Sequence, residues 1–156
     1  MSAFAAAYKA GIEAGQKALE NVQDIDAVFQ ALDEEIAANS GGKIHIAREM
    51  LSKTRRVRRI PSQMDELLGL HAPKPYSYYD DEISYDAIVA KNSKNAIEIA
   101  TYELSETGYP ITIKWADREE SCWDSAALAE TLQEVLSDVN TGKVLIRLLS
   151  DEVSNN

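Results

Sequence analysis

The chain has 156 residues, of which 45% are apolar, and a formal net charge of −10. This length and composition suit one globular domain or two small lobes and argue against wholesale disorder. The negative charge repels phosphate and anionic lipid, so it opposes general binding to nucleic acid or to a membrane surface. The only cysteine, Cys122, cannot form an intramolecular disulfide, and the sequence shows no signal peptide and no membrane-spanning run, so we expect a cytoplasmic protein.

The N-terminal part of the sequence predicts two amphipathic helices. The first begins after Ser2, a suitable cap, and runs to about residue 22. Its larger apolar side chains fall inside an arc of about 80° on a helical projection: Phe4, Tyr8, Ile12, Leu19 and Val22. The second helix is expected from about Asp24 to Ala38, with Gly41 and Gly42 ending it. Two helices with a short joint are typical of an antiparallel pair.

Small residues interrupt the first predicted helix. Gly11 and Gly15, together with the surrounding alanines, allow another helix to pack closely against this one. We interpret the small residues as an intramolecular contact. The alternative is a self-association face, which makes a homo-oligomer through the N-terminal helix the second expectation.

Residues 43–60 differ in charge from the rest of the chain. They contain seven basic residues and one acidic residue, so the segment carries +6 and the other 138 residues carry −16. Residues 43–47 alternate like a short strand, whereas residues 47–53 fit a helical turn equally well. A further short helix is suggested over residues 64–70, with Ser62 as its cap.

The basic run inside this segment is a candidate anion-binding site. One interpretation is a solvated segment, or one that pairs with the protein's own acids. The other is an anionic partner, with nucleic acid as one kind, because the arginine fork suits phosphate and carboxylate equally. The run does not form one face of a helix or a strand, and it consists of Lys53, Arg55, Arg56, Arg58 and Arg59.

The prolines at positions 73 and 75 exclude regular structure around them. We therefore predict a helical lobe over residues 1–70, a linker rich in Pro, Tyr and acids over 71–83, and an α+β lobe over 84–153, with a single domain as the alternative. The predicted fold class is α+β: the helical lobe packs with an antiparallel β-meander of about three strands and with one or two helices.

The second lobe contains the clearest alternation in the chain. Strands are expected over residues 84–90, 97–102 and 111–115. A helix capped by Asp124 or Ser125 follows and ends where residues 140–142 break it. Helical spacing favours another helix over residues 143–150, with a fourth strand as the alternative.

The sequence offers little catalytic equipment. Its two histidines are far apart, it contains no CxxC, HxxxH or HExxH spacing, and its Gly-Lys pairs lack the earlier glycine of a phosphate-binding loop, so we expect no metal and no cofactor. Acids surround Cys122 and are expected to raise the pKa of its thiol, which makes it a poor nucleophile. We therefore expect no enzyme, with a small hydrolase that uses unrecognised carboxylates as the alternative.

The acidic half of the chain suggests a binding function. Residues 71–156 carry 16 acids and 7 bases, and aromatic residues accompany those acids. Such a surface either provides solubility alone or steers a basic partner, with aromatic side chains filling its pockets. We expect a non-catalytic binding protein of the inhibitor, immunity or chaperone type that occludes a basic protein. The alternative is a nucleic-acid-associated regulator that uses Lys53–Arg59. The candidate partner-binding residues are Tyr78, Tyr79, Asp80, Asp81, Glu82, Asp117, Glu119, Glu120, Trp123 and Asp124.

Overall fold

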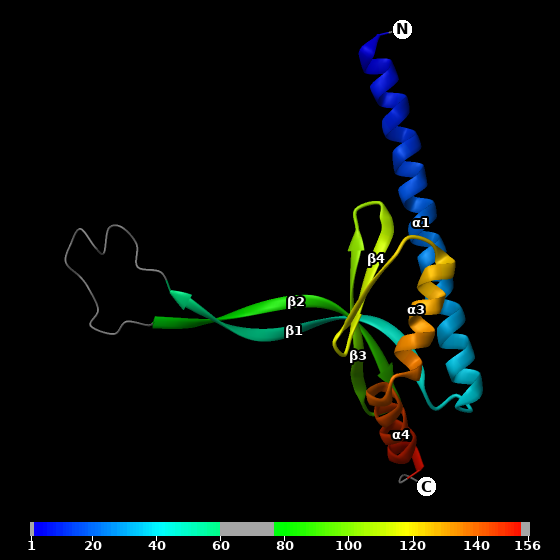
Figure 1. Ribbon diagram of the computed structural model, residues 1–156, viewed down its shortest axis with the longest axis vertical. Helices are drawn as coiled ribbons and strands as arrows, with labels where there is room; N and C mark the ends of the chain where they lie inside the picture. The colour runs from blue at the N-terminus through cyan, green and yellow to red at the C-terminus, as the bar shows by residue number, and fades with distance from the viewer. Residues whose placement is uncertain (1, 60–76, 154–156) are drawn as a thin grey trace, which may run out of the picture. The chain divides into compact units, whose positions relative to one another are not determined.

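The computed structural model describes residues 2–59 and 77–153 (Figure 1). The helix predicted over residues 64–70 and its cap Ser62 lie outside these residues, as does the first part of the predicted linker. The α+β fold class is confirmed, because one long helix, a five-stranded antiparallel sheet and two C-terminal helices make up the described chain. In chain order the elements are α1 (Ala3–Asn39), β1 (His45–Arg59), β2 (Ser77–Lys91), β3 (Ala96–Ser105), β4 (Gly108–Trp115), β5 (Arg118–Cys122), α3 (Ser125–Ser137) and α4 (Val139–Val153).

The predicted antiparallel pair of N-terminal helices is wrong, because α1 is one continuous helix of 37 residues. Its start and end are as expected: Ser2 Oγ accepts a hydrogen bond from the Ala5 amide at 3.3 Å, and Gly41 and Gly42 follow the helix with φ of 66° and 80°. The expected joint near Asp24 contains no glycine or proline to break the backbone ladder. Asp24 instead accepts a hydrogen bond of 2.6 Å from the Tyr109 hydroxyl.

The five strands form one sheet in the order β1-β2-β3-β4-β5. The three predicted strands are confirmed inside β2, β3 and β4, and β2, β3, β4 and β5 pair antiparallel in sequence. Residues 47–53, for which a helical turn was one of the open interpretations, belong to β1. Residues 77–83 belong to β2, which contradicts the predicted linker there. The sequence also gave no indication of β5, which has only one buried side chain.

The chain separates into two compact units. Unit 1 comprises residues 1–49 and 86–156, and therefore holds both the N-terminal helix and the C-terminal sheet and helices. Unit 2 comprises residues 50–85, whose described part consists of the remaining lengths of β1 and β2. The N-terminal helix and the meander, predicted as parts of two lobes, thus share one unit.

The core of unit 1 lies where the helices pack on the sheet. α1 contacts β4 and α3, α3 also contacts β5, and α4 contacts β3 and α3. The strand alternation of β4 places one set of side chains inward, as the spacing of residues 111–115 predicts. The large buried side chains are Ile25, Phe29, Ile46, Ile88, Ile111, Ile113, Trp115, Leu128, Leu132, Val135 and Leu148.

The C-terminal helices begin at carboxylate caps. Asp124 accepts a hydrogen bond of 2.7 Å from the Ala127 amide, which confirms one of its two predicted caps for α3. The predicted helix over residues 143–150 is confirmed within α4, but the predicted break at residues 140–142 is wrong. The break lies at Asp138, whose backbone is extended and whose Oδ2 accepts from the Asn140 amide at 2.9 Å.

The β3–β4 turn packs directly on the middle of α1. Asn21 Nδ2 donates a hydrogen bond of 2.9 Å to the Thr107 carbonyl oxygen. Gly108 is buried with φ of 90°, and a Cβ placed there would lie 2.8 Å from the Cβ of Asn21. Only glycine therefore fits this position, both for its backbone conformation and for the space against the helix.

Replacing this glycine should weaken the packing of the sheet on α1. We expect Gly108→Ala to lower the free energy of unfolding by about 1–3 kcal/mol, because the substitution adds both backbone strain and a steric clash. Gly142→Ala is the matched control, since Gly142 lies inside α4 with nothing within 4 Å of its Cβ position, and alanine there should leave stability unchanged or raise it by up to ~1 kcal/mol. Urea denaturation of both variants measures the difference, and equal stabilities would contradict the packing described.

The Tyr109–Asp24 hydrogen bond predicts a loss of stability at alkaline pH. Burial, and then the hydrogen bond and charge of Asp24, raise the pKa of Tyr109. The folded protein therefore keeps this phenol protonated above about pH 10, where it ionises in the unfolded chain, so its contribution is complete below that pH and is lost as the pH rises further.

We expect Tyr109→Phe to lose stability less steeply than the parent chain between about pH 10 and pH 12. Urea denaturation at stepped pH values measures the two slopes. Tyr8→Phe, which changes an exposed tyrosine on α1, should follow the parent. Parallel slopes for the parent chain and Tyr109→Phe would contradict the assignment.

Candidate functional site

Half of the predicted partner-binding residues lie together at one end of the sheet. We call them the acidic edge: Asp117, Glu119, Glu120, Trp123 and Asp124. They occupy the β4–β5 turn, strand β5 and the connection to α3. β5 is the last strand in the sheet order and pairs with β4 alone. The acidic edge therefore lies along an outer strand of unit 1.

The turn before β5 is tight. Trp115 pairs with Arg118 in the β4–β5 ladder, which leaves only Ala116 and Asp117 to reverse the chain. Ala116 has φ of 50°, a conformation that favours glycine. A strained non-glycine residue thus holds the turn that presents Asp117 to solvent.

The acids of β5 point to both sides of the sheet. Glu120 lies opposite Ile113, on the side that carries the core, whereas Glu119 lies opposite Lys114 on the other side. Both glutamates are exposed. Successive side chains of a strand alternate between faces, so the acidic edge forms a charged rim rather than the single acidic face that the sequence suggested.

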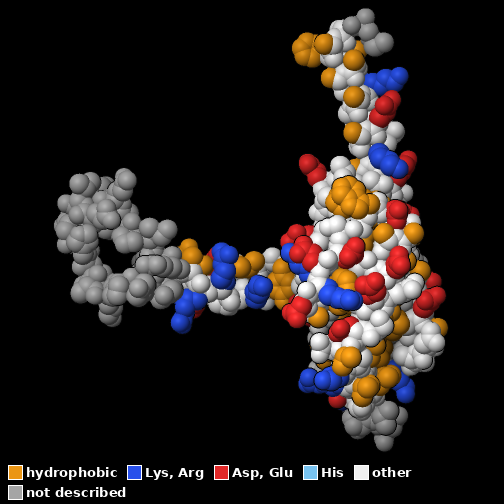
Figure 2. Space-filling view, viewed as in Figure 1, with side chains coloured by type: hydrophobic (Ala, Val, Ile, Leu, Met, Phe, Trp, Pro, Cys, Tyr) orange, Lys and Arg blue, Asp and Glu red, His pale blue; other side chains and the backbone are white. Residues whose placement is uncertain are grey.

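The carboxylates of this rim are poorly neutralised. The nearest cation in sequence, Arg118, pairs with Glu134 at 3.6 Å, and Lys114 pairs with Glu103 at 3.5 Å. Within the described residues, Asp117, Glu119 and Glu120 have no ion-pair partner. Figure 2 shows that many Asp and Glu side chains lie on the surface of unit 1. The acidic edge is therefore a source of negative potential that faces water.

Trp123 is the aromatic member of the acidic edge and is 70% exposed. The other tryptophan, Trp115, is only 5% exposed and belongs to the core. Trp123 follows the buried Cys122 and precedes Asp124, which caps α3. An exposed indole held between a strand end and a helix cap is the kind of side chain that dominates protein interfaces.

Cys122 anchors this segment as a buried side chain. Its side chain is fully buried and its thiol donates a hydrogen bond of 3.3 Å to Thr131 Oγ1. Burial raises the pKa of the Cys122 thiol, and the carboxylates of Glu120 and Asp124 raise it further. The direction agrees with the prediction from sequence, although burial rather than the neighbouring acids is the main cause.

The other predicted partner-binding residues lie in unit 2, on β2. Tyr79 is 49% exposed, and Asp80 and Glu82 are exposed without an ion-pair partner in the described part of the chain. Asp81 differs, because its Oδ2 lies 3.3 Å from Arg55 Nη2 on β1. The remaining residue of this group is Tyr78, which belongs to β2. The structure thus places the candidate residues in two separate groups, one in each unit.

The basic run lies on β1 and is partly engaged by its own hairpin. Arg55 pairs with Asp81, and the Lys53 ammonium lies 5.1 Å from the centre of the Tyr85 ring. Arg56 also has an interaction within the structure. Arg58 and Arg59 complete the run at the end of β1. These contacts favour the interpretation in which the segment pairs with the protein's own side chains.

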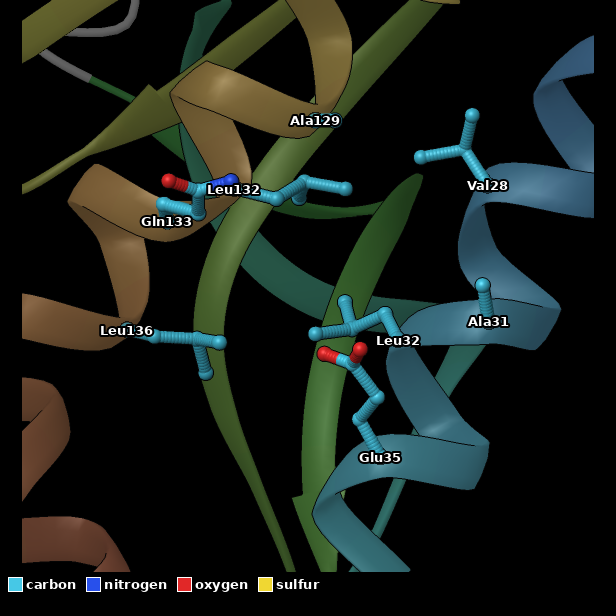
Figure 3. A pocket seen from close by; sticks show the side chains of 8 residues that line it. All are labelled: Val28, Ala31, Leu32, Glu35, Ala129, Leu132, Gln133 and Leu136. Carbon is cyan, nitrogen blue, oxygen red and sulfur yellow. The ribbon is translucent and has the colours of Figure 1, made fainter.

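A small apolar groove between α1 and α3 was not anticipated as a site. It has a volume of about 280 Å³, and Figure 3 shows Leu32 on α1 together with Leu132 and Leu136 on α3 beside the opening. Glu35 and Gln133 are its polar members. The leucine spacing that lines the groove was visible in the sequence as the core stripe of both helices.

Two further tests for a site are negative within residues 2–59 and 77–153. No group of three or more His, Cys, Asp or Glu side chains there could hold a metal ion. None of the helices in this part of the chain is long and apolar enough to cross a membrane.

His45 contacts Asp33 at 3.1 Å, and that same carboxylate accepts a hydrogen bond from the Ile46 amide, so this pair joins α1 to β1.

The environment of Cys122 predicts that its thiol reacts slowly with thiol reagents. Because its pKa is raised and its side chain is buried, the folded protein should react with Ellman's reagent at pH 8 at least ~100-fold more slowly than the urea-unfolded chain. A Gln16→Cys variant, with its new thiol on the exposed part of α1, supplies the control and should release one equivalent quickly and one slowly. Fast reaction of folded parent protein would contradict the assignment.

No protein-family model, no curated protein and no solved structure matches this chain. The function therefore has to follow from the chemistry of the acidic edge and of the hairpin in unit 2.

Proposed function

We propose that this protein is a non-catalytic binding protein that occludes a basic partner protein through an acidic, aromatic-containing surface. The acidic edge of unit 1 is its principal contact. The observation that carries the proposal is the 70% exposed indole of Trp123 on the same outer-strand segment as the exposed carboxylates of Glu119 and Glu120, which have no ion-pair partner in the described chain. An inhibitor, an immunity protein or a chaperone-like protein would use such a surface.

The physical mechanism combines attraction at a distance with burial on contact. Unpaired carboxylates raise the rate of encounter with a cationic surface, because their field reaches about one Debye length, roughly 8–10 Å at physiological salt. On contact, lysine and arginine side chains of the partner pair with Glu119 and Glu120. The Trp123 ring enters a pocket and leaves water, which slows dissociation.

The second group, Tyr79, Asp80 and Glu82 on β2, offers the same chemistry in unit 2. We propose it as a second contact surface, in unit 2, for basic proteins. Its contribution is smaller, because Asp81 already pairs with Arg55 and no tryptophan accompanies it. The single, buried cysteine supports a cytoplasmic location as part of the same proposal.

The nucleic-acid alternative has weaker support. Contacts within the hairpin occupy Lys53 and Arg55, so the positive field of the basic run is reduced where a phosphate backbone would bind. The hydrolase alternative would require a cleft with two carboxyl groups whose pKa values are raised. The groove between α1 and α3 contains one carboxylate, Glu35. Neither alternative therefore displaces protein binding as the proposed function.

The proposal predicts a change in association rate on charge reversal. The partner is first captured from a lysate of the native host with the immobilised parent chain at low salt, and its binding rates are then measured with purified proteins. We expect Asp117→Lys, Glu119→Lys and Glu120→Lys together to slow association by about tenfold or more at low salt and by much less at high salt. Trp123→Ala should instead raise the dissociation rate by roughly tenfold or more.

A matched control separates local from overall charge. Glu13→Lys, Glu20→Lys and Glu98→Lys together also change the net charge from −10 to −4 but lie on α1 and β3, and they should leave association nearly unchanged. Equal slowing by both sets would contradict a localised site. Retention of the parent chain on DNA or RNA, lost on replacing Arg55, Arg56, Arg58 and Arg59 by alanine, would favour the nucleic-acid alternative instead.

A further inference from the structure

The N-terminal part of α1 is exposed to solvent, and we call residues 2–17 the bare segment. Residues 2–17 are all exposed, and this part of the helix extends past the β3–β4 turn (Figure 1). Large apolar side chains lie on it or just after it: Phe4 is 89% exposed, Tyr8 73% and Leu19 67%. Soluble proteins rarely leave so many large apolar side chains on one stretch of helix uncovered. A helix with an apolar face usually gains its stability by packing that face against another element, and here the face has no cover in the described chain.

The spacing of this apolar face is regular. Residues 4, 8, 11, 15, 18 and 22 follow one another at alternating steps of four and three, the spacing of a helix–helix seam. The same steps continue into residues 25, 29, 32 and 36, which belong to the core or pack against it. The face that α3 and the sheet cover in the second half of α1 is therefore the face left open in the first half.

Charge is absent from a wide sector around this seam. The charged residues between positions 4 and 22 lie together on the opposite side of the helix: Lys9, Glu13, Lys17 and Glu20. The positions that flank the seam hold alanine, Ile12, Leu19 and Asn21 instead. Flanking positions usually carry charges that set the choice and the orientation of the partner. Their absence here favours a partner face that is equally apolar, which the same helix of another copy supplies.

We propose that a second copy of this chain covers the bare segment, with the two α1 helices packed antiparallel about a twofold axis near residue 13. This register places Phe4 opposite Val22 of the second copy, Tyr8 opposite Ala18 and Gly11 opposite Gly15. Large side chains then meet small ones across the seam. No atom lies within 4 Å of a Cβ placed at Gly11 or Gly15, so the helices can approach closely there.

The surface of α1 contains a groove that could accept an aromatic side chain of the second copy. A shallow groove of about 540 Å³ lies along the bare segment beside the β3–β4 turn. Ile12, Leu19 and Val22 line it, and Glu106 is its charged member. In the proposed register the groove of each copy receives Phe4 of the other. An isologous interface of this kind presents the same patch on both subunits.

The length of the seam, residues 4–22, fits this arrangement. At about 1.5 Å per residue, residues 4–22 extend about 28 Å, and half of the accessible surface of such a helix is on the order of 500 Å². A pair would bury on the order of 1,000 Å² in total, near the lower limit for a specific interface. The antiparallel register ends where the β3–β4 turn contacts Asn21, so each N-terminus stops as the other subunit's sheet begins.

The test measures self-association of the full chain. We expect sedimentation equilibrium between about 1 and 200 µM to show a monomer–dimer equilibrium with a roughly micromolar dissociation constant. Phe4→Lys with Tyr8→Lys should weaken it by about tenfold or more. Ala6→Lys with Ala10→Lys adds the same charge away from the seam and should leave it within about twofold. Circular dichroism verifies that both variants keep the helix.

Cross-linking tests the orientation. A Tyr8→Cys variant is mixed with an Ala18→Cys variant and oxidised, and the antiparallel register predicts the mixed disulfide between the two. A parent chain that stays monomeric across the concentration range, an equal effect of the two lysine pairs, or cross-linking of Tyr8→Cys with itself would each overturn the proposal. These measurements need no basic partner, so their outcome is independent of the proposed binding function.

Discussion

The contact of the β3–β4 turn with the middle of α1 is the constraint on which the arrangement of unit 1 depends. Gly108 brings the turn against Asn21 without a side chain between them, and the Tyr109 hydroxyl binds Asp24 three residues further along the helix. Because β4 is thereby held against α1, the apolar side chains that follow on the helix meet the sheet and α3, and those that precede it meet water. β5 pairs with the outer side of β4 and is the last strand of the sheet, so the residues of the acidic edge lie along an outer strand.

Local chemistry explains what could be predicted from sequence. Alternation of apolar and polar residues predicts the strands inside β2, β3 and β4. Ser2 and Asp124 could be predicted as helix caps because their side-chain oxygens can accept hydrogen bonds from the first backbone amides of a helix. Continuity of α1 was missed, although the sequence has no glycine or proline near Asp24 and its apolar spacing of three and four residues continues from residue 4 to residue 36. β5 was missed because an edge strand needs only one buried side chain, Cys122, and so lacks the alternation that identifies inner strands.

For the candidate site, the sequence could predict which residues to consider but not how they are arranged. The acids and Trp123 could be chosen from composition, and the Trp123 ring is exposed. Their arrangement could not be predicted, because it depends on pairing between strands distant in sequence. That pairing turns Glu119 and Glu120 to opposite sides of the sheet and brings Asp81 to Arg55. Tertiary contacts of Lys53, Arg55 and Arg56 thus reduce the availability of the basic run to an anionic partner, and spacing along the sequence does not indicate these contacts.

The bare half of α1 has a consequence for binding strength. Two chains joined through it would carry two acidic edges on one particle, related by the twofold axis. Against a multivalent target, the second edge would engage at a high effective concentration after the first had bound, and modest individual affinities would combine into avidity. Dimerisation through the uncovered turns of α1 would therefore raise the overall affinity of the acidic edges for a target with repeated basic sites.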